Sequence, residues 1–203
     1  VSPKYASLDE MPAGAVVGTA SLRRELMVRI NYPHLDVRPI RGNVGTRLRK
    51  LDEGEYDALV MASAGLKRLE LSERIRSIIP AEKSLPSPGQ GALGVEIRKG
   101  DKVLEEALGF LNDPHTRACC TAERAVSRAL GGSCQVPLAA YAVVEGEEMW
   151  LRALVGNHHT GECVRAEARG PWTDPQALAA AVLEDLRRQG AEKILADVLG
   201  RQD

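Results

Sequence analysis

Three short apolar runs alternate with three helical patterns along residues 15–71, and this alternation constrains the fold more than any other feature. The apolar runs lie at residues 15–18, 35–40 and 57–62, and the helical patterns at residues 21–31, 45–53 and 65–71. In the first helical pattern Leu22, Leu26 and Ile30 recur every four residues, which places them on one helix face. Strands that alternate with helices across short connections are typical of a parallel sheet. We therefore predict an α/β domain over residues 1–87.

The second half of the chain shows a different pattern, because its apolar residues recur with a period of two. The predicted strands are residues 138–144, 149–155 and 163–168, separated by turn residues. A predicted helix over residues 114–130 precedes them. Asp174 and Pro175 begin a second one that runs to about residue 199, with a break expected at Gly190. We therefore predict a smaller α+β domain with a three-stranded antiparallel sheet over residues 112–203.

Between the two patterns lies a stretch rich in residues that interrupt regular structure. Its prolines and glycines are Pro80, Pro86, Pro88, Gly89, Gly91 and Gly94. This composition predicts a hinge, which we place at residues 88–111. Within it, residues 92–97 form an apolar run that predicts a strand, and residues 101–111 predict a helix.

The composition is that of an ordinary globular protein and gives the chain no overall electrostatic preference. Hydrophobic residues make up 44%, charged residues 27%, and the net charge is −1. This balance argues against nucleic acid and membranes as partners, so any anion site must come from local clustering of arginine and lysine. We find no signal peptide and no apolar run of membrane-spanning length. The four cysteines do not form a disulfide-like pattern, which favours the reducing cytoplasm.

The three strand–helix junctions share a composition of small residues followed by cations. Their sequences are GTASLRR (18–24), RGNVGTR (41–47) and ASAGLKR (62–68). Ligands of open parallel sheets bind beyond the carboxyl ends of the strands, where helix N-termini offer free N–H groups. A cation is unfavourable beside the positive end of a helix dipole, so its repetition there predicts a ligand with several carboxylates or phosphates. The candidate binding residues are Arg23, Arg24, Arg41, Arg47 and Arg68.

The alternative is that each of these arginines lies on a solvated helix face. For any single arginine that interpretation is the better one, and only the threefold repetition favours a polyanion site. The junctions do not match the phosphate-binding loop GxxxxGK[ST], so a nucleotide is not indicated.

Cys134 lies in the sequence LGGSCQVP (residues 130–137), directly after the predicted helix of residues 114–130. The two glycines before it and the proline after it predict an exposed loop. An exposed thiol is a candidate attachment point or nucleophile. The alternative is an inert, packed thiol, because most lone cysteines behave as small hydrophobic residues.

The remaining cysteines and the paired histidines are expected to be structural. Cys119 and Cys120 fall in a helical pattern and Cys163 in a strand, so we expect packing roles. Since no Cys-x-x-Cys pair is present, a thiol redox protein is disfavoured. The histidine pair at residues 158–159 lies in a polar turn without further ligands at metal-site spacing, which predicts a surface turn rather than a metal site.

Long stretches of the sequence resemble signatures of the porphobilinogen deaminase (hydroxymethylbilane synthase) family of tetrapyrrole biosynthesis. The matching stretches are GTASLRR, RGNVGTRLRKLDEGEYDALVMASAGLKRL, LPSPGQGALGVE, TAERA and GGSCQVP, in the order of the family. The resemblance covers essentially the whole chain and implies a three-domain enzyme, of which this chain represents the second and third domains. It also implies that residues 88–111 return toward the first domain, so that residues 92–97 lack their sheet partners without it.

The resemblance implies a transferase that joins four porphobilinogen molecules into the linear tetrapyrrole hydroxymethylbilane and releases ammonia. The family builds this product on a dipyrromethane cofactor held by a thioether, and the matching position is Cys134. The five arginines would hold the carboxylates of the cofactor and the substrate, with Thr19 and Ser21 as hydrogen-bonding neighbours and Gln90 in the cleft. The family's catalytic aspartate belongs to the first domain, and no residue of this chain matches its motif.

The resemblance further implies a cytoplasmic monomer whose partners are porphobilinogen and the growing pyrrole chain, without a metal. We expect the present chain to bind these molecules at most and to be inactive alone. The alternative hypothesis is a non-catalytic polycarboxylate-binding module, because the α/β pattern also resembles periplasmic binding proteins. On either hypothesis Arg23 and Arg24 are expected at the surface, facing the cleft.

Overall fold

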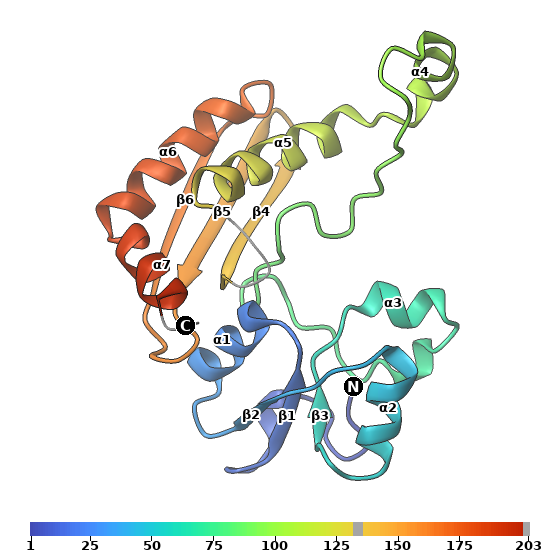
Figure 1. Ribbon diagram of the computed structural model, residues 1–203, viewed down its shortest axis with the longest axis vertical. Helices are drawn as coiled ribbons and strands as arrows, with labels where there is room; N and C mark the ends of the chain where they lie inside the picture. The colour runs from blue at the N-terminus through green and yellow to red at the C-terminus, as the bar shows by residue number, and fades with distance from the viewer. Residues whose placement is uncertain (132–135, 201–203) are drawn as a thin grey trace.

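The computed structural model describes residues 1–131 and 136–200. The chain forms two units, each built on a three-stranded sheet (Figure 1). The N-terminal unit contains a parallel sheet, and the C-terminal unit contains an antiparallel sheet. Both predicted fold classes, α/β followed by α+β, are confirmed.

The parallel sheet places three strand ends and three helix starts at one edge. β1 (Val16–Thr19) lies between β2 (Asp36–Pro39) and β3 (Ala58–Leu59), and both neighbours run parallel to it. The helices that follow the strands are α1 (Leu22–Asn31), α2 (Val44–Asp52) and α3 (Ser63–Arg68), and single 3₁₀ turns lie at Leu8–Glu10 (η1) and Ser72–Arg74 (η2). Ligands of such sheets bind at the edge where the parallel strands end.

Side-chain caps determine where α1 and α2 begin. The Oγ of Ser21 accepts a hydrogen bond from the backbone N–H of Arg24 at 3.4 Å. The Oδ1 of Asn43 accepts one from the backbone N–H of Thr46 at 2.8 Å. Each cap satisfies a donor of the first helical turn that has no partner within the helix, which fixes the helix start next to its strand.

Apolar side chains cover the parallel sheet on both faces. The cluster on the α1 face includes Val17, Val28 and Val37, and the cluster on the α2 face includes Leu51 and Leu59. At Gly18 of β1 a Cβ atom would lie 2.6 Å from Cδ2 of Leu59 and 2.8 Å from Cδ1 of Tyr56. Only glycine fits this point of close approach between β1 and the α2 side of the core.

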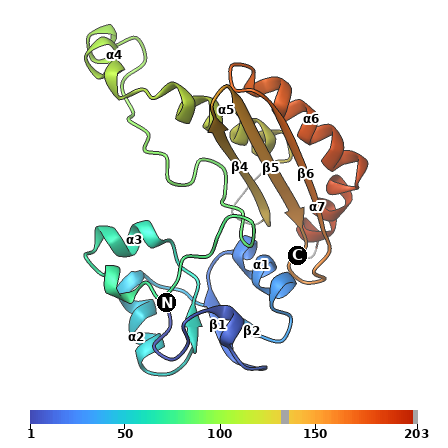
Figure 2. The ribbon, with the colours of Figure 1, turned by 180° about the vertical axis from the view of Figure 1, so that it is seen from behind.

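The C-terminal unit packs three helices on one face of its sheet. β4 (Leu138–Glu145), β5 (Glu148–Gly156) and β6 (Cys163–Pro171) pair antiparallel in that order. α5 (Pro114–Ala129), α6 (Pro175–Arg188) and α7 (Ala191–Leu199) cover one face of this sheet (Figures 1 and 2). Every second residue of β5, such as Leu151 and Val155, points into the large aliphatic core beneath the helices. The expected break at Gly190 is confirmed, since its φ of 93° separates α6 from α7.

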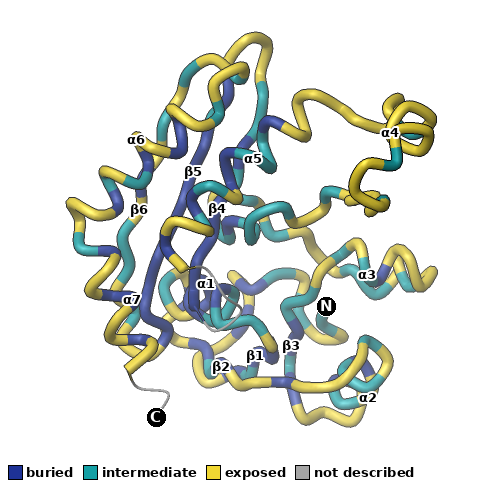
Figure 3. The backbone as a smooth tube through the Cα atoms, turned by 45° about the horizontal axis from the view of Figure 1, so that its top comes forward, coloured by how far each residue is buried: buried dark blue, intermediate teal, exposed yellow. Residues whose placement is uncertain are grey.

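The hinge region differs from the sequence prediction. Residues 92–97 form no strand, and the predicted helix of residues 101–111 is limited to α4 (Lys102–Leu108) and a 3₁₀ turn, Gly109–Leu111 (η3). Leu93 is 86% exposed and Phe110 81% exposed. α4 stands away from both units in Figures 1 and 2, and Figure 3 colours most of its residues as exposed. The apolar run therefore has a strand-like sequence but no sheet among the described residues to pair with.

The two units meet through a small apolar cluster at α1. Leu26 and Met27 of α1 pack with Ala139 and Leu154 of the second sheet and with Leu85 of the connection between the units. α1 is therefore shared between the units, and its N-terminus lies beside the connecting chain. Among the residues described, no helix combines the length and the apolar composition that a membrane crossing requires.

Candidate functional site

A cleft of about 400 Å³ lies at the carboxyl edge of the parallel sheet. Its wall combines the start of α1, β3, the start of α3, the N-terminal segment and the chain that leads to the second unit. The cations on this wall are Arg23, Arg24 and Arg76, and the described residues that line the cleft include neither aspartate nor glutamate. The cleft is therefore positively charged without an acidic counterpart of its own.

Arg23 is buried, with 7% of its surface exposed. Its guanidinium donates to the carbonyl oxygen of Leu85 and, at 3.3 Å, to Oε1 of Gln90, which are both neutral acceptors. Within the described part of the chain it forms no ion pair. Burial, together with the nearby charge of Arg24, lowers the pKa of Arg23 to about 10. The expectation that Arg23 is a surface residue is wrong, because the connecting chain folds over its side chain.

Arg24 is half-buried beside Arg23. Burial, and then the charge of Arg47, lower the pKa of Arg24. Arg47 lies in the first turn of α2, and its Nε donates to the carbonyl oxygen of Gly42 at 2.7 Å. Three guanidinium groups thus lie close enough for their charges to interact unfavourably, and no described carboxylate is paired with any of them. An anionic ligand would relieve this repulsion.

The other two candidate arginines are placed differently. Arg41 is exposed in the loop before α2, and Arg68 is exposed at the C-terminal end of α3 rather than in its first turn. Neither belongs to the described lining of the cleft, and Arg47 lies outside that lining as well. α3 begins at Ser63, earlier than predicted, and this moves Arg68 away from the helix start.

Thr19 and Ser21 support the start of α1. Thr19 is buried, and its Oγ1 accepts a hydrogen bond from the backbone N–H of Ser21 at 3.3 Å. Ser21 in turn caps the helix through Arg24. Both hydroxyl groups thereby fix the backbone that carries the two adjacent arginines.

Gln90 lies on the wall of the cleft and connects Arg23 to the turn formed by residues 87–90. Besides the bond from Arg23, its Oε1 accepts from the Oγ of Ser87 at 3.2 Å and from the backbone N–H of Ser87 at 3.4 Å. The side chain therefore holds the guanidinium against the connecting chain.

Two residues that line the cleft, Arg76 and Tyr141, were not predicted from the sequence. Arg76 follows η2 and not a strand, so it is not one of the arginines predicted from the strand–helix junctions. Tyr141 reaches the cleft from β4 of the other unit, and contact between two distant elements leaves no local sequence signal. Only a search for arginines outside the junctions could have found the first.

Cys134 lies outside the described residues. Cys119 and Cys163 have the packing roles that were expected, since Cys119 packs against the large core and Cys163 against the cluster between the units. Burial is the main reason that the pKa of Cys119 rises to about 11. Burial also raises the pKa of Cys120, so neither helical thiol is a reactive thiolate at neutral pH.

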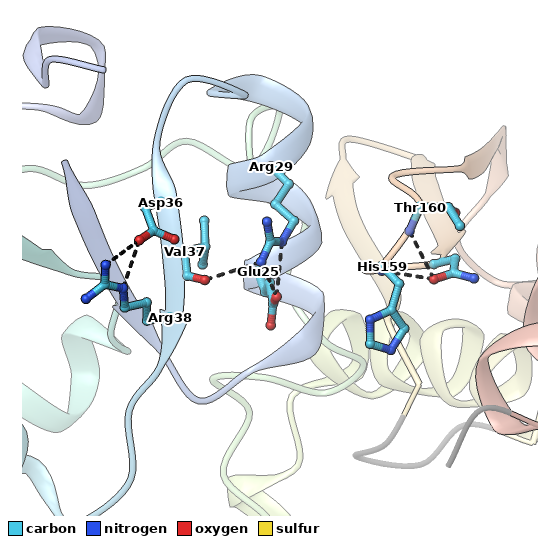
Figure 4. A network of polar contacts seen from close by, with 8 residues as sticks. Glu25, Arg29, Asp36, Val37, Arg38, His159 and Thr160 are labelled. Atoms are coloured by element: carbon cyan, nitrogen blue, oxygen red, sulfur yellow. Dashed lines mark hydrogen bonds and ion pairs between the residues drawn. The ribbon is translucent and has the colours of Figure 1, made fainter. Parts of the chain in front are cut away.

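The histidine pair lies in the predicted turn, but one of its rings is not at the surface. His158 is buried, and its Nδ1 has no hydrogen-bond partner within the described part of the chain. The turn is held by Oδ1 of Asn157, which accepts from the backbone N–H of His159 at 2.9 Å. Figure 4 shows this turn across from the Glu25–Arg29 pair of α1. Burial and the neighbouring His159 lower the pKa of His158, so its neutral form is favoured.

Comparison with known proteins assigns the two units to one family. A family model described as "Porphobilinogen deaminase, dipyromethane cofactor binding domain" matches residues 1–106, and one described as "Porphobilinogen deaminase, C-terminal domain" matches residues 117–188. The chain belongs to the porphobilinogen deaminase family. The first matched range contains all five candidate arginines, and the second contains Cys134.

Curated porphobilinogen deaminases are similar over nearly the whole chain. The protein of Bordetella parapertussis is 55% identical over 199 residues, which is 98% of this chain and 63% of that protein. The protein of Neisseria meningitidis serogroup A is 53% identical over 203 residues, or 100% of this chain and 65% of that protein. The protein of Thiobacillus denitrificans is 51% identical over 195 residues, or 96% and 64%. The chain thus spans a little less than two thirds of the length of these relatives.

Proposed function

We propose that this chain is part of a hydroxymethylbilane synthase, a transferase that condenses four porphobilinogen molecules into hydroxymethylbilane and releases ammonia. The observation that carries the proposal is the cleft itself, in which Arg23 is buried with no carboxylate partner among the described residues and Arg24 lies beside it. Burying an unpaired cation is costly, and a folded protein retains one where a ligand supplies the counter-charge. Each pyrrole of the proposed substrate carries an acetate and a propionate, so the chemistry of ligand and cleft agrees.

The same donor set fits a dipyrromethane cofactor, which carries four carboxylates. Arg23, Arg24 and Arg47 would hold its carboxylates, since planar guanidinium groups pair bidentately with them. When bound, the cofactor supplies the pyrrole end to which new units are joined. Cys134 would anchor it through a thioether. Arg41 and Arg68, exposed near the same edge, are proposed to hold carboxylates of the lengthening chain.

The protein groups have distinct tasks in this proposal. The guanidinium groups bind and orient the carboxylates and offset their charge, while Thr19 and Ser21 keep the start of α1 in place. Burial strengthens each ion pair because the local dielectric is lower than that of water. We propose that proton transfer belongs to an aspartate in the part of the relatives beyond the match, since the described lining of the cleft contains no acidic residue.

We further propose that residues 88–111 contact that same part of the relatives. The apolar residues of this segment, including Leu93 and Phe110, are largely exposed here. On this proposal the enzyme acts as a cytoplasmic monomer, and the present chain binds substrate without turnover.

Binding and chemistry are tested separately. Calorimetry with porphobilinogen should detect binding to this chain, and an assay for ammonia should detect no release. Arg24→Leu should abolish the binding heat, whereas Arg49→Leu, on an exposed position of α2 outside the cleft, should leave it unchanged. Hydroxymethylbilane synthesis by the present chain would contradict the proposed location of the catalytic aspartate.

Attachment of the cofactor is tested by mass. The intact mass of the full-length enzyme should include two pyrrole units, which Cys134→Ser should remove. An active enzyme with an unmodified, dispensable Cys134 would refute the assignment.

A second candidate function is a polycarboxylate-binding module without catalysis. It is favoured by the three arginines that line the cleft, Arg23, Arg24 and Arg76, because the described lining contains no acidic residue beside them. Binding of citrate as tightly as porphobilinogen, with no ammonia release by the full-length protein, would support the module over the enzyme.

A further inference from the structure

A buried carboxylate joins the connecting chain to the second unit at a point outside the cleft. Glu123 lies on α5, and only 5% of its surface is exposed. Its Oε1 accepts from the backbone N–H of Ala142 at 2.8 Å, and its Oε2 accepts from the backbone N–H of Gly89 at 2.6 Å. Both oxygens are thus occupied by backbone donors from two separate segments.

The two donors belong to different parts of the molecule. Ala142 is in β4, the edge strand of the second sheet, and its N–H points away from β5 toward α5. Gly89 belongs to the turn of residues 87–90 in the connecting chain, where the backbone N–H of Gln90 donates to the carbonyl oxygen of Ser87 at 3.0 Å. Glu123 therefore attaches this turn to the edge of the second sheet.

A short path leads from this carboxylate to the cleft. Gln90 follows Gly89 directly, and its Oε1 accepts the hydrogen bond of Arg23 at 3.3 Å. Arg23 also donates to Leu85 in the same connecting chain. The buried guanidinium is thereby held by a chain segment whose own position depends on Glu123.

We propose that Glu123 is a positioning residue for the anion site, which it serves by holding the 87–90 turn against Arg23. The inference rests on the proposed function, because it assumes that Arg23 binds a carboxylate of the substrate or the cofactor. A carboxylate suits the position because it offers two acceptors to two donors. Glutamine would turn an amide donor toward one of the two backbone N–H groups and leave that group unpaired.

The test uses the full-length enzyme with its cofactor attached. Glu123→Gln should raise KM for porphobilinogen by on the order of tenfold, the loss that corresponds to one unpaired buried donor, and should change kcat less. A purely structural defect would lower the amount of folded enzyme, and so the maximal rate, without moving KM. Glu184→Gln, at an exposed position of α6, is the matched control and should leave both constants unchanged.

A double-mutant cycle separates this inference from the proposed function. Glu123→Gln and Arg23→Leu together should raise KM no more than Arg23→Leu alone, whereas Glu123→Gln and Arg68→Leu should act additively. Additive effects of Glu123→Gln and Arg23→Leu, or an unchanged KM in Glu123→Gln, would overturn the positioning role. An unchanged KM in Arg23→Leu would instead contradict the proposed function.

A second variant covers the case in which Glu123→Gln does not fold. Gln90→Leu removes the contact between the turn and Arg23 but keeps both hydrogen bonds of Glu123. It should raise KM and be non-additive with Arg23→Leu. An unchanged KM in Gln90→Leu would refute the path from Glu123 to the guanidinium.

Discussion

At the scale of single residues, Arg23 and Arg24 are adjacent in sequence but differ in environment. Arg23 is buried and bonded to neutral acceptors, whereas Arg24 is half-buried and repelled by Arg47. The affinity for an anionic ligand should therefore come from relief of the repulsion among these arginines as well as from new hydrogen bonds.

A polycarboxylate should raise the thermal stability of the chain. A ligand at 100 times its Kd stabilises the folded state by about 2.7 kcal/mol, because it binds that state alone. Citrate or porphobilinogen should therefore raise Tm by several degrees, and Arg24→Leu should remove most of the increase. Thermal unfolding followed by circular dichroism measures the shift, and Arg49→Leu serves as the control. An equal shift in both variants would exclude the cleft as the binding site.

Gly18→Ala should destabilise the N-terminal unit. The added Cβ would meet Leu59 at 2.6 Å, and overpacking of this kind costs about 1–3 kcal/mol. Gly65→Ala in α3 is the matched control. An added Cβ there would meet no described atom within 4 Å beyond its own helix and chain neighbours, and alanine favours the helix by roughly 0.5–1 kcal/mol. Urea unfolding of both variants measures the difference, and equal midpoints would contradict the packing described for β1.

At the scale of elements, the turn between β5 and β6 packs toward α1 and buries His158. His159 on the same turn, and Glu25 and Arg29 on α1, are the charged or titratable groups that act on it. The contact between the units therefore contains a group that is favoured in its neutral form.

This contact should weaken in acid. The pKa of His158 is lowered in the folded state from its unfolded value of 6.5. As pH falls below 6.5, the unfolded state therefore binds more protons than the folded state does. The stabilisation is present above pH 6.5 and is lost as pH falls through the folded-state pKa. The free energy of unfolding, measured in urea between pH 8 and pH 5, should fall less in His158→Gln. The same pH slope in both proteins would show that His158 does not contribute.

At the scale of the whole molecule, the exposed segment around α4 stands out against two well-packed units (Figure 3). The family relatives are longer than the matched region, and the segment is proposed to pack there. While its apolar side chains are exposed to solvent, they contribute little to the free energy of unfolding.

Leu93→Asp tests this placement. In the present chain it should change the free energy of unfolding by less than about 0.5 kcal/mol, because Leu93 is exposed. In the full-length enzyme it should cost several kcal/mol, since a buried, unpaired carboxylate is unfavourable. Denaturant unfolding of both proteins provides the comparison. Equal effects in the two would mean that the segment stays solvated in the longer protein.

The sequence was sufficient for features that depend on neighbours along the chain. Strand–helix alternation predicted the parallel sheet, and the period of two predicted the antiparallel sheet. The predicted starts of α1 at residue 21 and of α2 at residue 45 are each within one residue of the structure. The prediction failed at residues 92–97, where the apolar pattern is that of a strand but pairing requires another strand beside it. The junction motifs likewise identified the arginines but could not show that Arg23 is buried, because its burial depends on contact with the distant connecting chain.

The sequence by itself determined the fold class, the starts of α1 and α2, and the positions of the arginines at the first two junctions, because periodicity and local hydrogen bonds act over a few residues. Only the tertiary structure decided that Arg23 is buried under the connecting chain, that Arg68 is outside the described lining of the cleft, and that Glu123 ties the hinge to the second sheet. These outcomes depend on contacts between segments far apart in the chain, such as the 34 positions that separate Gly89 from Glu123. Burial and charge repulsion arise only when such segments meet.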